Sequence, residues 1–151
     1  MLSKLSVAGQ NGQFRTPKQI RDMMVQLRKP SPDDMICDPA CGTAGFLISA
    51  AEYIREHYPN MTDKQWELFD TDTFSGFETD PTMLRISAMN LMLHSITRPE
   101  VKWQDSISKN NEIKDRYDLI LANPPFTGTV DEENINPALT RMAATKKTEL
   151  L

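Results

Sequence analysis

The chain has 151 residues and a formal net charge of −4, from 17 Lys and Arg against 21 Asp and Glu. With 39% hydrophobic and 25% charged residues, it has the composition of one globular domain with a core of its own. We expect a cytoplasmic protein, because no apolar run is long enough to span a membrane and the N-terminus lacks the apolar core of a signal peptide. The negative net charge argues against this chain alone being a strong binder of the DNA phosphate backbone.

The first predicted element is a helix that follows a flexible lead-in over residues 1–13. Thr16 is a good N-cap, Pro17 suits the first helical position, and Gln19 completes a capping box. Four apolar residues then recur at helical spacing, which predicts a stripe packed on the core. These residues are Ile20, Met23, Met24 and Leu27. Pro30 ends the helix.

The most informative stretch is M-I-C-D-P-A-C-G-T-A-G-F-L, over residues 35–47. It predicts a short buried strand that ends at Asp38, a turn of small residues, and a helix that opens at Phe46. Gly42 and Gly45 would let a ligand and the helix approach the backbone closely. A strand, a glycine turn and a helix N-terminus form the nucleotide-binding corner of an open α/β sheet, yet neither G-x-G-x-x-G nor a P-loop lysine is present.

Two cysteines, Cys37 and Cys41, lie in this stretch, and neither His57 nor His94 is near them in the sequence. Their spacing does not match the C-x-x-C pattern of a metal site or a redox pair. We therefore expect two thiols here and no bound metal.

Further strands and helices alternate along the rest of the chain. We expect strands over residues 73–78, 101–104 and 117–122. We expect helices from Phe46 to about Tyr58, from Thr62 to Leu68 with a capping box at Gln65, and from Asp80-Pro81 to Ser95. This alternation predicts an α/β fold with parallel strands and right-handed crossovers.

The last part of the sequence has a different character. Residues 127–137 are polar without an apolar period, which indicates a mobile loop, and residues 138–147 suit a weak helix. An apolar segment begins at Thr148 as the sequence stops. We expect a sheet truncated after the fourth strand, in a fragment of a longer protein.

Four polar residues end the four predicted strands: Asp38, Glu78, Asp105 and Asn123. A single acid at such a position is often only a helix cap, but ligands bind at the carboxyl edge of parallel sheets, and four in register favour a site. There Glu78 would accept from ribose hydroxyls, and Asp105 from an adenine amine. Asp38 would face an ammonium group, and the amides of residues 43–45 would face a carboxylate. None of these roles requires a phosphate on the ligand, so S-adenosylmethionine, which has no phosphate, fits better than NAD.

The tetrapeptide Asn123-Pro124-Pro125-Phe126 suits a planar amine as methyl acceptor. The Asn123 side-chain oxygen and the Pro124 carbonyl would hold the two N–H groups of the amine. The prolines stiffen the loop, and Phe126 would stack on a base swung out of a duplex. Catalysis of this kind depends on positioning and electrostatics, without a metal.

These motifs together resemble an N6-adenine DNA methyltransferase, and more closely the modification (M) subunit of a type I restriction-modification system. The matching pieces, in the family's order, are G-Q-F-R-T-P, D-P-A-C-G-T-A-G-F-L, G-F-E-T-D-P, A-M-N-L-M-L-H and L-A-N-P-P-F. The resemblance implies a Rossmann-like S-adenosylmethionine-dependent fold, with a mostly parallel sheet and helices on both faces. It also implies one partial catalytic domain over residues 1–151. This domain would consist of a lead and cofactor-capping helix (1–30), a cofactor half-sheet with the catalytic loop (31–126), and a loop with the start of another element (127–151).

The resemblance also assigns site residues by position. The first group would wrap the methionine end of the cofactor: Gln13, Phe14, Arg15, Thr16, Pro17 and Lys18. The second would line the cofactor: Thr43, Ala44, Gly45, Glu78 and Asp105, to which the reading of the residues themselves adds Asp38 and Gly42. The catalytic group would be Asn123, Pro124, Pro125 and Phe126.

The implied activity is site-specific transfer of a methyl group from S-adenosylmethionine to N6 of adenine in double-stranded DNA. The implied partners are the specificity and restriction subunits of the same system. In such systems a separate specificity subunit reads the target sequence, which is consistent with the negative net charge of this chain.

Two alternatives stay open at this point. N-P-P-F serves amide and base amines alike, so a methyltransferase that acts on a protein glutamine or on RNA is one alternative. A cofactor-binding or assembly module without catalysis is the other alternative. Methylation assays with and without Asn123→Ala would separate these possibilities.

Overall fold

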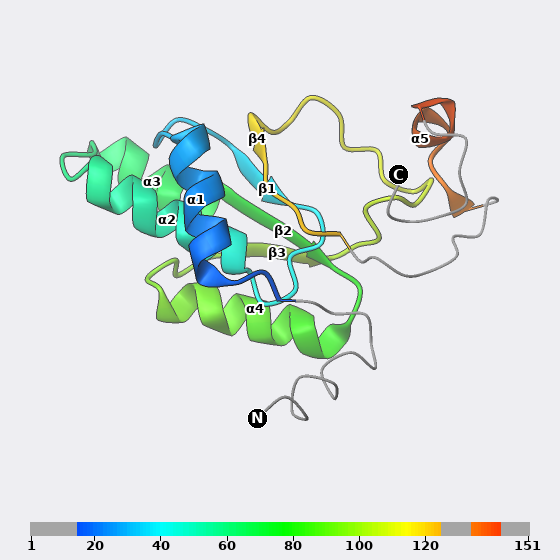
Figure 1. Cartoon of the computed structure of the whole chain (residues 1–151), viewed down its shortest axis with the longest axis horizontal. Helices are drawn as coiled ribbons and strands as arrows, with labels where there is room; N and C mark the ends of the chain where they lie inside the picture. The colour runs from blue at the N-terminus through cyan, green and yellow to red at the C-terminus, as the bar shows by residue number, and fades with distance from the viewer. Residues whose placement is uncertain (1–14, 125–133, 143–151) are drawn as a thin grey trace.

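The computed structural model describes residues 15–124 and 134–142, and Figure 1 shows its course. The helices are α1 (Lys18–Arg28), α2 (Gly45–His57), α3 (Asp63–Thr71), α4 (Pro81–Leu93) and α5 (Pro137–Met142). The strands are β1 (Ile36–Asp38), β2 (Phe74–Glu78), β3 (Glu100–Trp103) and β4 (Leu119–Ile120). The predicted lead-in over residues 1–13 lies outside the described residues, as do most of the predicted loop and the end of the last predicted helix.

The four strands form one parallel sheet in the order β3-β2-β1-β4. The predicted α/β fold with parallel strands is therefore confirmed. Asp38 pairs with Gly76, and Glu78 pairs with Trp103, so the strands end at one common edge. Because the chain leaves β1 toward β2 and later returns to its other side as β4, the sheet has a topological switch point between β1 and β4.

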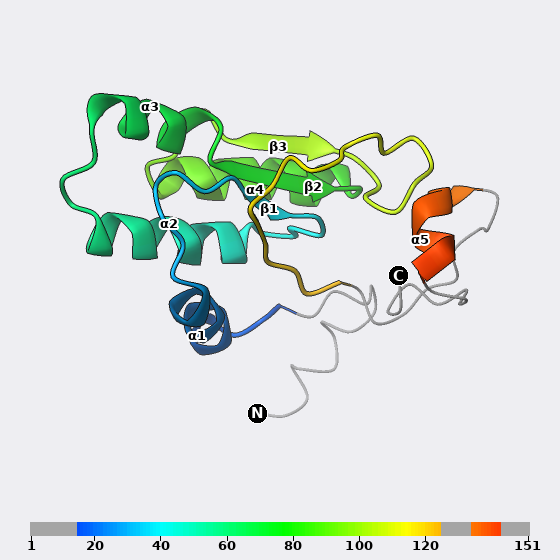
Figure 2. The same cartoon turned by 90° about the horizontal axis from the view of Figure 1, so that it is seen from above.

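Helices α2 and α4 pack on one face of this sheet, and α1 packs against α2. The crossovers from β1 to β2 and from β2 to β3 run in the same direction, so right-handed connections bring α2 and α4 to the same face. Arg55 of α2 donates to the carbonyl of His94 at the end of α4, at 2.7 Å. Helix α1 packs across α2 (Figure 2). Of the two expected helical layers, the described residues form the one that contains α1, α2 and α4.

The core lies between this helical layer and the sheet. Its fully buried side chains come mainly from α2 and the strands: they include Ile36, Leu47, Ala50, Ile54, Phe74 and Leu91. Helix α3 closes the end of the sheet where the strands begin, since its Phe69 ring contacts Phe74 edge-on at a centroid distance of 4.9 Å. The strand ends opposite to α3 stay free for a site.

The predicted start of α1 is wrong, whereas the predicted starts of α3 and α4 are confirmed. Pro17 is the N-cap of α1 and no side chain caps this helix, because the Pro17 carbonyl already accepts the first helical bonds, from Ile20 and Arg21. Thr16 is thereby one residue too early to cap. At α3, Thr62 and Gln65 form the expected capping box, and at α4 the Asp80 side chain accepts from two backbone N–H groups.

The predicted core stripe of α1 is also wrong. Ile20, Met23 and Leu27 are 43%, 50% and 76% exposed, while Met24 is half-buried and packs on the core. The residue that α1 buries fully is Val25, which is 1% exposed. The helix is rotated from the expected orientation because it packs across α2 with the face that contains Val25.

None of the helices in the described ranges is long and apolar enough to cross a membrane.

Candidate functional site

The loop that follows β1 begins with a buried carboxylate. Asp38 is 2% exposed, and its Oδ1 accepts a hydrogen bond from the Ala40 backbone N–H at 3.1 Å. Burial raises the pKa of Asp38 to about 7, and the charge of Glu78 acts in the same direction, although the bond from Ala40 lowers it. Asp38 is thus a carboxyl group that would gain from a cationic ligand.

Glu78 ties two loops together at the ends of β1 and β2. Its Oε2 accepts from the Gly42 N–H at 3.1 Å, and its Oε1 accepts from the N–H groups of Thr79 and Asp80 at 2.8 and 2.9 Å. A carboxylate has about four lone-pair directions, so three backbone bonds leave room for one more donor. A ribose with two hydroxyls would therefore have to share Glu78 with the backbone or displace one of these bonds.

The turn between β1 and α2 adopts the strained backbone that a tight corner needs. Gly42 has φ +52°, and nothing lies within 4 Å of the place where a Cβ would be. Ala44, the N-cap of α2, has φ 61° and no side chain that could cap the helix. The backbone N–H groups of the first turn of α2 thus have no side-chain acceptor at the helix N-cap, which is the arrangement that binds anions.

Thr43 is supported by a residue that the sequence motifs did not single out. Its carbonyl accepts from Asn90 Nδ2 of α4 at 2.8 Å. The A-M-N-L-M-L-H stretch contains this asparagine, and a polar side chain within an apolar helix was the available signal. Helix α4 therefore stabilises the loop before α2 through this hydrogen bond, although it contributes no predicted cofactor residue.

Asp105 lies on the same edge of the sheet but faces solvent. Its Oδ1 accepts from the Ile107 N–H at 3.1 Å, and its carbonyl accepts from Ser108, so it stabilises a turn. The neighbouring Ser106 Oγ donates to the Pro39 carbonyl, which joins this turn to the loop after β1. The structure therefore brings the turn at Asp105 beside the loop that begins at Asp38.

A cavity of about 400 Å³ lies at the switch point of the sheet. It brings together segments that are about a hundred residues apart in sequence: Arg15, Thr16, Pro17, Ile20, Met24, Phe46, Ala122 and Asn123. Asn123 is half-buried there and Pro124 is exposed. Lys18 does not line the cavity, since its Nζ contacts Asp22 and Glu52 at 3.0 and 2.9 Å. The other predicted residues of these motifs, Gln13, Phe14, Pro125 and Phe126, lie outside the described residues.

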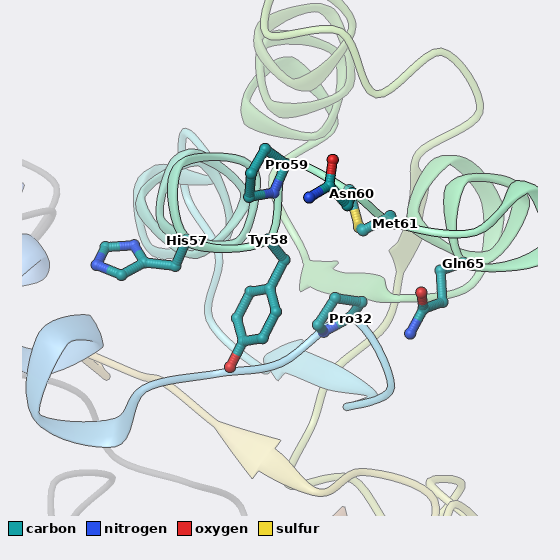
Figure 3. A pocket seen from close by; sticks show the side chains of 7 residues that line it. All are labelled: Pro32, His57, Tyr58, Pro59, Asn60, Met61 and Gln65. Carbon is teal, nitrogen blue, oxygen red and sulfur yellow. The ribbon is translucent and has the colours of Figure 1, made fainter.

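A second cavity, of about 260 Å³, is shown in Figure 3. It lies between the end of α2 and the start of α3, and its walls are Pro32, His57, Tyr58, Pro59, Asn60, Met61 and Gln65. None of the predicted site residues lines it. Its position beside α3, at the end of the sheet where the strands begin, separates it from the loops that contain Asp38 and Glu78.

The two cysteines, Cys37 and Cys41, are both buried free thiols. Burial raises the pKa of both Cys37 and Cys41 to about 12, with the charge of Asp38 as the next cause. Both side chains are therefore protonated thiols near neutral pH. Among the residues described, no group of three or more His, Cys, Asp and Glu side chains is arranged to hold a metal ion.

An acidic strand edge beside a helix N-terminus without a side-chain cap suits a cofactor with hydroxyls and a zwitterionic end. Together with the parallel sheet, this defines the Rossmann-like class of methyltransferase folds. The chain belongs to the N-6 DNA methylase family, whose sequence profile matches residues 1–149.

Similar proteins agree with this assignment. The chain is 31% identical, over 87% of its length, to the type I restriction enzyme EcoEI methylase subunit of Escherichia coli. It is 29% identical, over 90% of its length, to the StySPI methylase subunit of Salmonella potsdam. The crystal structure of the type I restriction enzyme EcoKI M protein superimposes with a TM-score of 0.72 at 26% identity, over 89% of this chain and 31% of that one. The chain spans 27% of the length of the two methylase subunits.

Proposed function

We propose that the protein transfers a methyl group from S-adenosylmethionine to N6 of adenine in double-stranded DNA, as the modification subunit of a type I restriction-modification system. The main observation in support is the cavity at the switch point, where Asn123 lies opposite Arg15–Pro17 and beside Phe46. Asn123 and the segment predicted to wrap the methionine end of the cofactor, Arg15–Pro17, thus line one cavity, as transfer to a planar amine requires. We further propose that the protein acts with DNA, a specificity subunit and a restriction subunit.

The residues around the loop after β1 fit this cofactor. Asp38, whose pKa is raised to about 7, suits an ammonium group, and the uncapped N-terminus of α2 suits a carboxylate. Glu78 has one acceptor direction to spare for a ribose hydroxyl. When bound, S-adenosylmethionine supplies an electrophilic methyl group on a positively charged sulfur. We propose that Gln13 and Phe14 complete this end of the site and that Asp105 contacts the adenine.

The chain's own part in the reaction is to hold the acceptor. The Asn123 side-chain oxygen and the Pro124 carbonyl accept hydrogen bonds from the two N–H groups of the adenine amine. These bonds orient the nitrogen lone pair toward the methyl group and stabilise the positive charge that develops on the nitrogen. Pro125 stiffens the loop, and Phe126 stacks on the base after it leaves the duplex. The proton then passes to water, because no described residue at the cavity is a strong base.

The decisive test is methyl transfer by the full-length protein, co-expressed with its specificity subunit in a host without N6-adenine methylation. We expect N6-methyladenine in the genomic DNA, and at least a hundredfold less with Asn123→Ala. S-adenosylhomocysteine should still bind to that variant. Methylation of protein or RNA in place of DNA, or unchanged methylation by Asn123→Ala, would contradict the proposal. Cofactor binding without any transfer would instead indicate an assembly module.

A further inference from the structure

Arg21 of α1 contacts the cofactor loop in a way that no sequence motif indicated. Its guanidinium occupies the place of a side chain at Gly45, the first residue of α2. A Cβ built on Gly45 would lie 1.9 Å from Arg21 Nη1 and 2.7 Å from Cζ. A side chain at Gly45 would therefore have to displace the guanidinium of Arg21.

One nitrogen of this guanidinium, Nε, has no hydrogen-bond partner among the described residues. Arg21 Nε is buried and makes no hydrogen bond, and it is the one buried side-chain polar atom without a bond in the described ranges. No carboxylate of those ranges lies within ion-pair distance of Arg21; the adjacent Asp22 is occupied by Lys18 and by Ser49 Oγ at 3.0 and 2.8 Å. The charge of Arg21 acts on Asp22 without an ion-pair contact, so a half-buried guanidinium with an unbonded Nε would gain from an anionic ligand.

The surroundings of Arg21 favour an anionic partner. The N-terminal end of α2 has no side-chain cap and no acidic residue in its first turn. The helix dipole and the free N–H groups there add to the charge of Arg21. Asp38 begins the same loop and Glu78 accepts from the Gly42 N–H within it, so these two carboxyl groups form an acidic pole. The loop from Asp38 to Gly45 thus separates an acidic pole from a basic one.

We propose that Arg21 binds the carboxylate of the cofactor's amino-acid end, while Asp38 receives its ammonium group. The inference rests on the proposed function, since it names a further residue of the same cofactor site. The amino-acid end of the cofactor has a carboxylate and an ammonium group on one carbon, and the loop has Arg21 near one end and Asp38 at the other to bind them. The guanidinium gives two parallel N–H donors to a carboxylate, which a lysine does not.

The test compares two ligands that differ only at this end. Calorimetry on the full-length protein measures binding of S-adenosylhomocysteine and of 5′-methylthioadenosine, which lacks the amino-acid group. Arg21→Ala should weaken S-adenosylhomocysteine about tenfold or more and leave 5′-methylthioadenosine unchanged. Arg21→Lys should recover part of the loss. Arg28→Ala, a change of the exposed arginine in the last turn of the same helix, should affect neither ligand.

Gly45→Ala provides an independent variant, because its methyl group would push the guanidinium aside. It should show the same selective loss, and the double variant with Arg21→Ala should lose no more than either alone. Equal weakening of both ligands by Arg21→Ala would mean that Arg21 only supports the loop, and an unchanged affinity would mean that it contacts neither. If the wild-type protein binds neither ligand, the proposed cofactor is wrong and this inference falls with it.

Discussion

At the scale of single residues, Asp38 makes the clearest prediction. The pKa of its buried carboxyl is about 7 in the folded protein, against 3.8 for an ordinary Asp. Between these pH values the unfolded chain releases a proton that the folded protein retains, so the free energy of unfolding falls as pH rises through the window. Asp38→Asn still accepts a hydrogen bond from Ala40 but cannot ionise. We expect it to be more stable than the wild type by about 2–4 kcal/mol near pH 8 and nearly equal near pH 4.

Urea unfolding at a series of pH values measures this difference. Glu56→Gln, which changes an exposed carboxylate on α2, should follow the wild-type curve. A pH dependence that persists in Asp38→Asn would show that another group causes it.

Asn90 gives a second prediction at this scale. Its Nδ2 donates to the Thr43 carbonyl, and Asn90→Ala leaves this carbonyl without its protein donor. We expect a loss of about 1–2 kcal/mol in the free energy of unfolding and several-fold weaker binding of S-adenosylhomocysteine, because the loop loses its support. Met89→Ala, at a position that is 62% exposed on the same helix, should change neither quantity. Unchanged ligand affinity in a destabilised Asn90→Ala would limit Asn90 to a role in stability.

At the scale of elements, two threonines with the same motif should behave differently. Thr16 and Thr62 are each followed three residues later by glutamine, but only Thr62 caps its helix. Thr62→Ala removes the acceptor for the Gln65 N–H and should cost about 1 kcal/mol of stability. Thr16→Ala should change stability by less than about 0.5 kcal/mol. Chemical unfolding of both variants tests the pair, and equal losses would mean that Thr16 caps α1 in solution.

Helix α1 makes the other prediction at this scale. Val25→Ala opens a cavity at a side chain that is 1% exposed, and we expect a loss of about 2 kcal/mol. Leu27→Ala changes a larger side chain that is 76% exposed, and should cost less than about 0.5 kcal/mol. Unfolding of the 151-residue chain tests both. A larger loss for Leu27→Ala would show that the predicted stripe packs on the core after all.

The helices also show which parts of the fold a sequence reveals. The strands, their parallel orientation and the caps of α3 and α4 follow from patterns in the sequence, so they were predictable. The orientation of α1 was not, because an apolar stripe does not specify which neighbour a helix meets. Arg21 and Asn90 escaped prediction for the same reason: each acts on the loop before α2 from a helix that is distant in sequence. The strand-end residues were predictable as a group, since parallel strands bring their carboxyl ends to one edge.

At the scale of the whole molecule, the distribution of charge suits binding of the cofactor but not binding of DNA. The chain has a net charge of −4, and Asp38, Glu78 and Asp105 lie together on the edge that contains the candidate site. A duplex is held mainly by cations that replace its counterions, and this edge offers a DNA phosphate little attraction. We therefore expect the 151-residue chain alone not to bind a short duplex measurably at about 0.1 M salt.

Fluorescence anisotropy with a labelled duplex measures this, with S-adenosylhomocysteine binding to the same sample as the control for folding. Added specificity subunit should restore DNA binding with a steep salt dependence, because that partner would supply the phosphate contacts. Tight, salt-dependent binding by the chain alone would mean that its 17 basic residues form a DNA-binding face despite the negative total. This chain would then bind both the cofactor and the DNA phosphates, without the need for a specificity subunit to bind DNA.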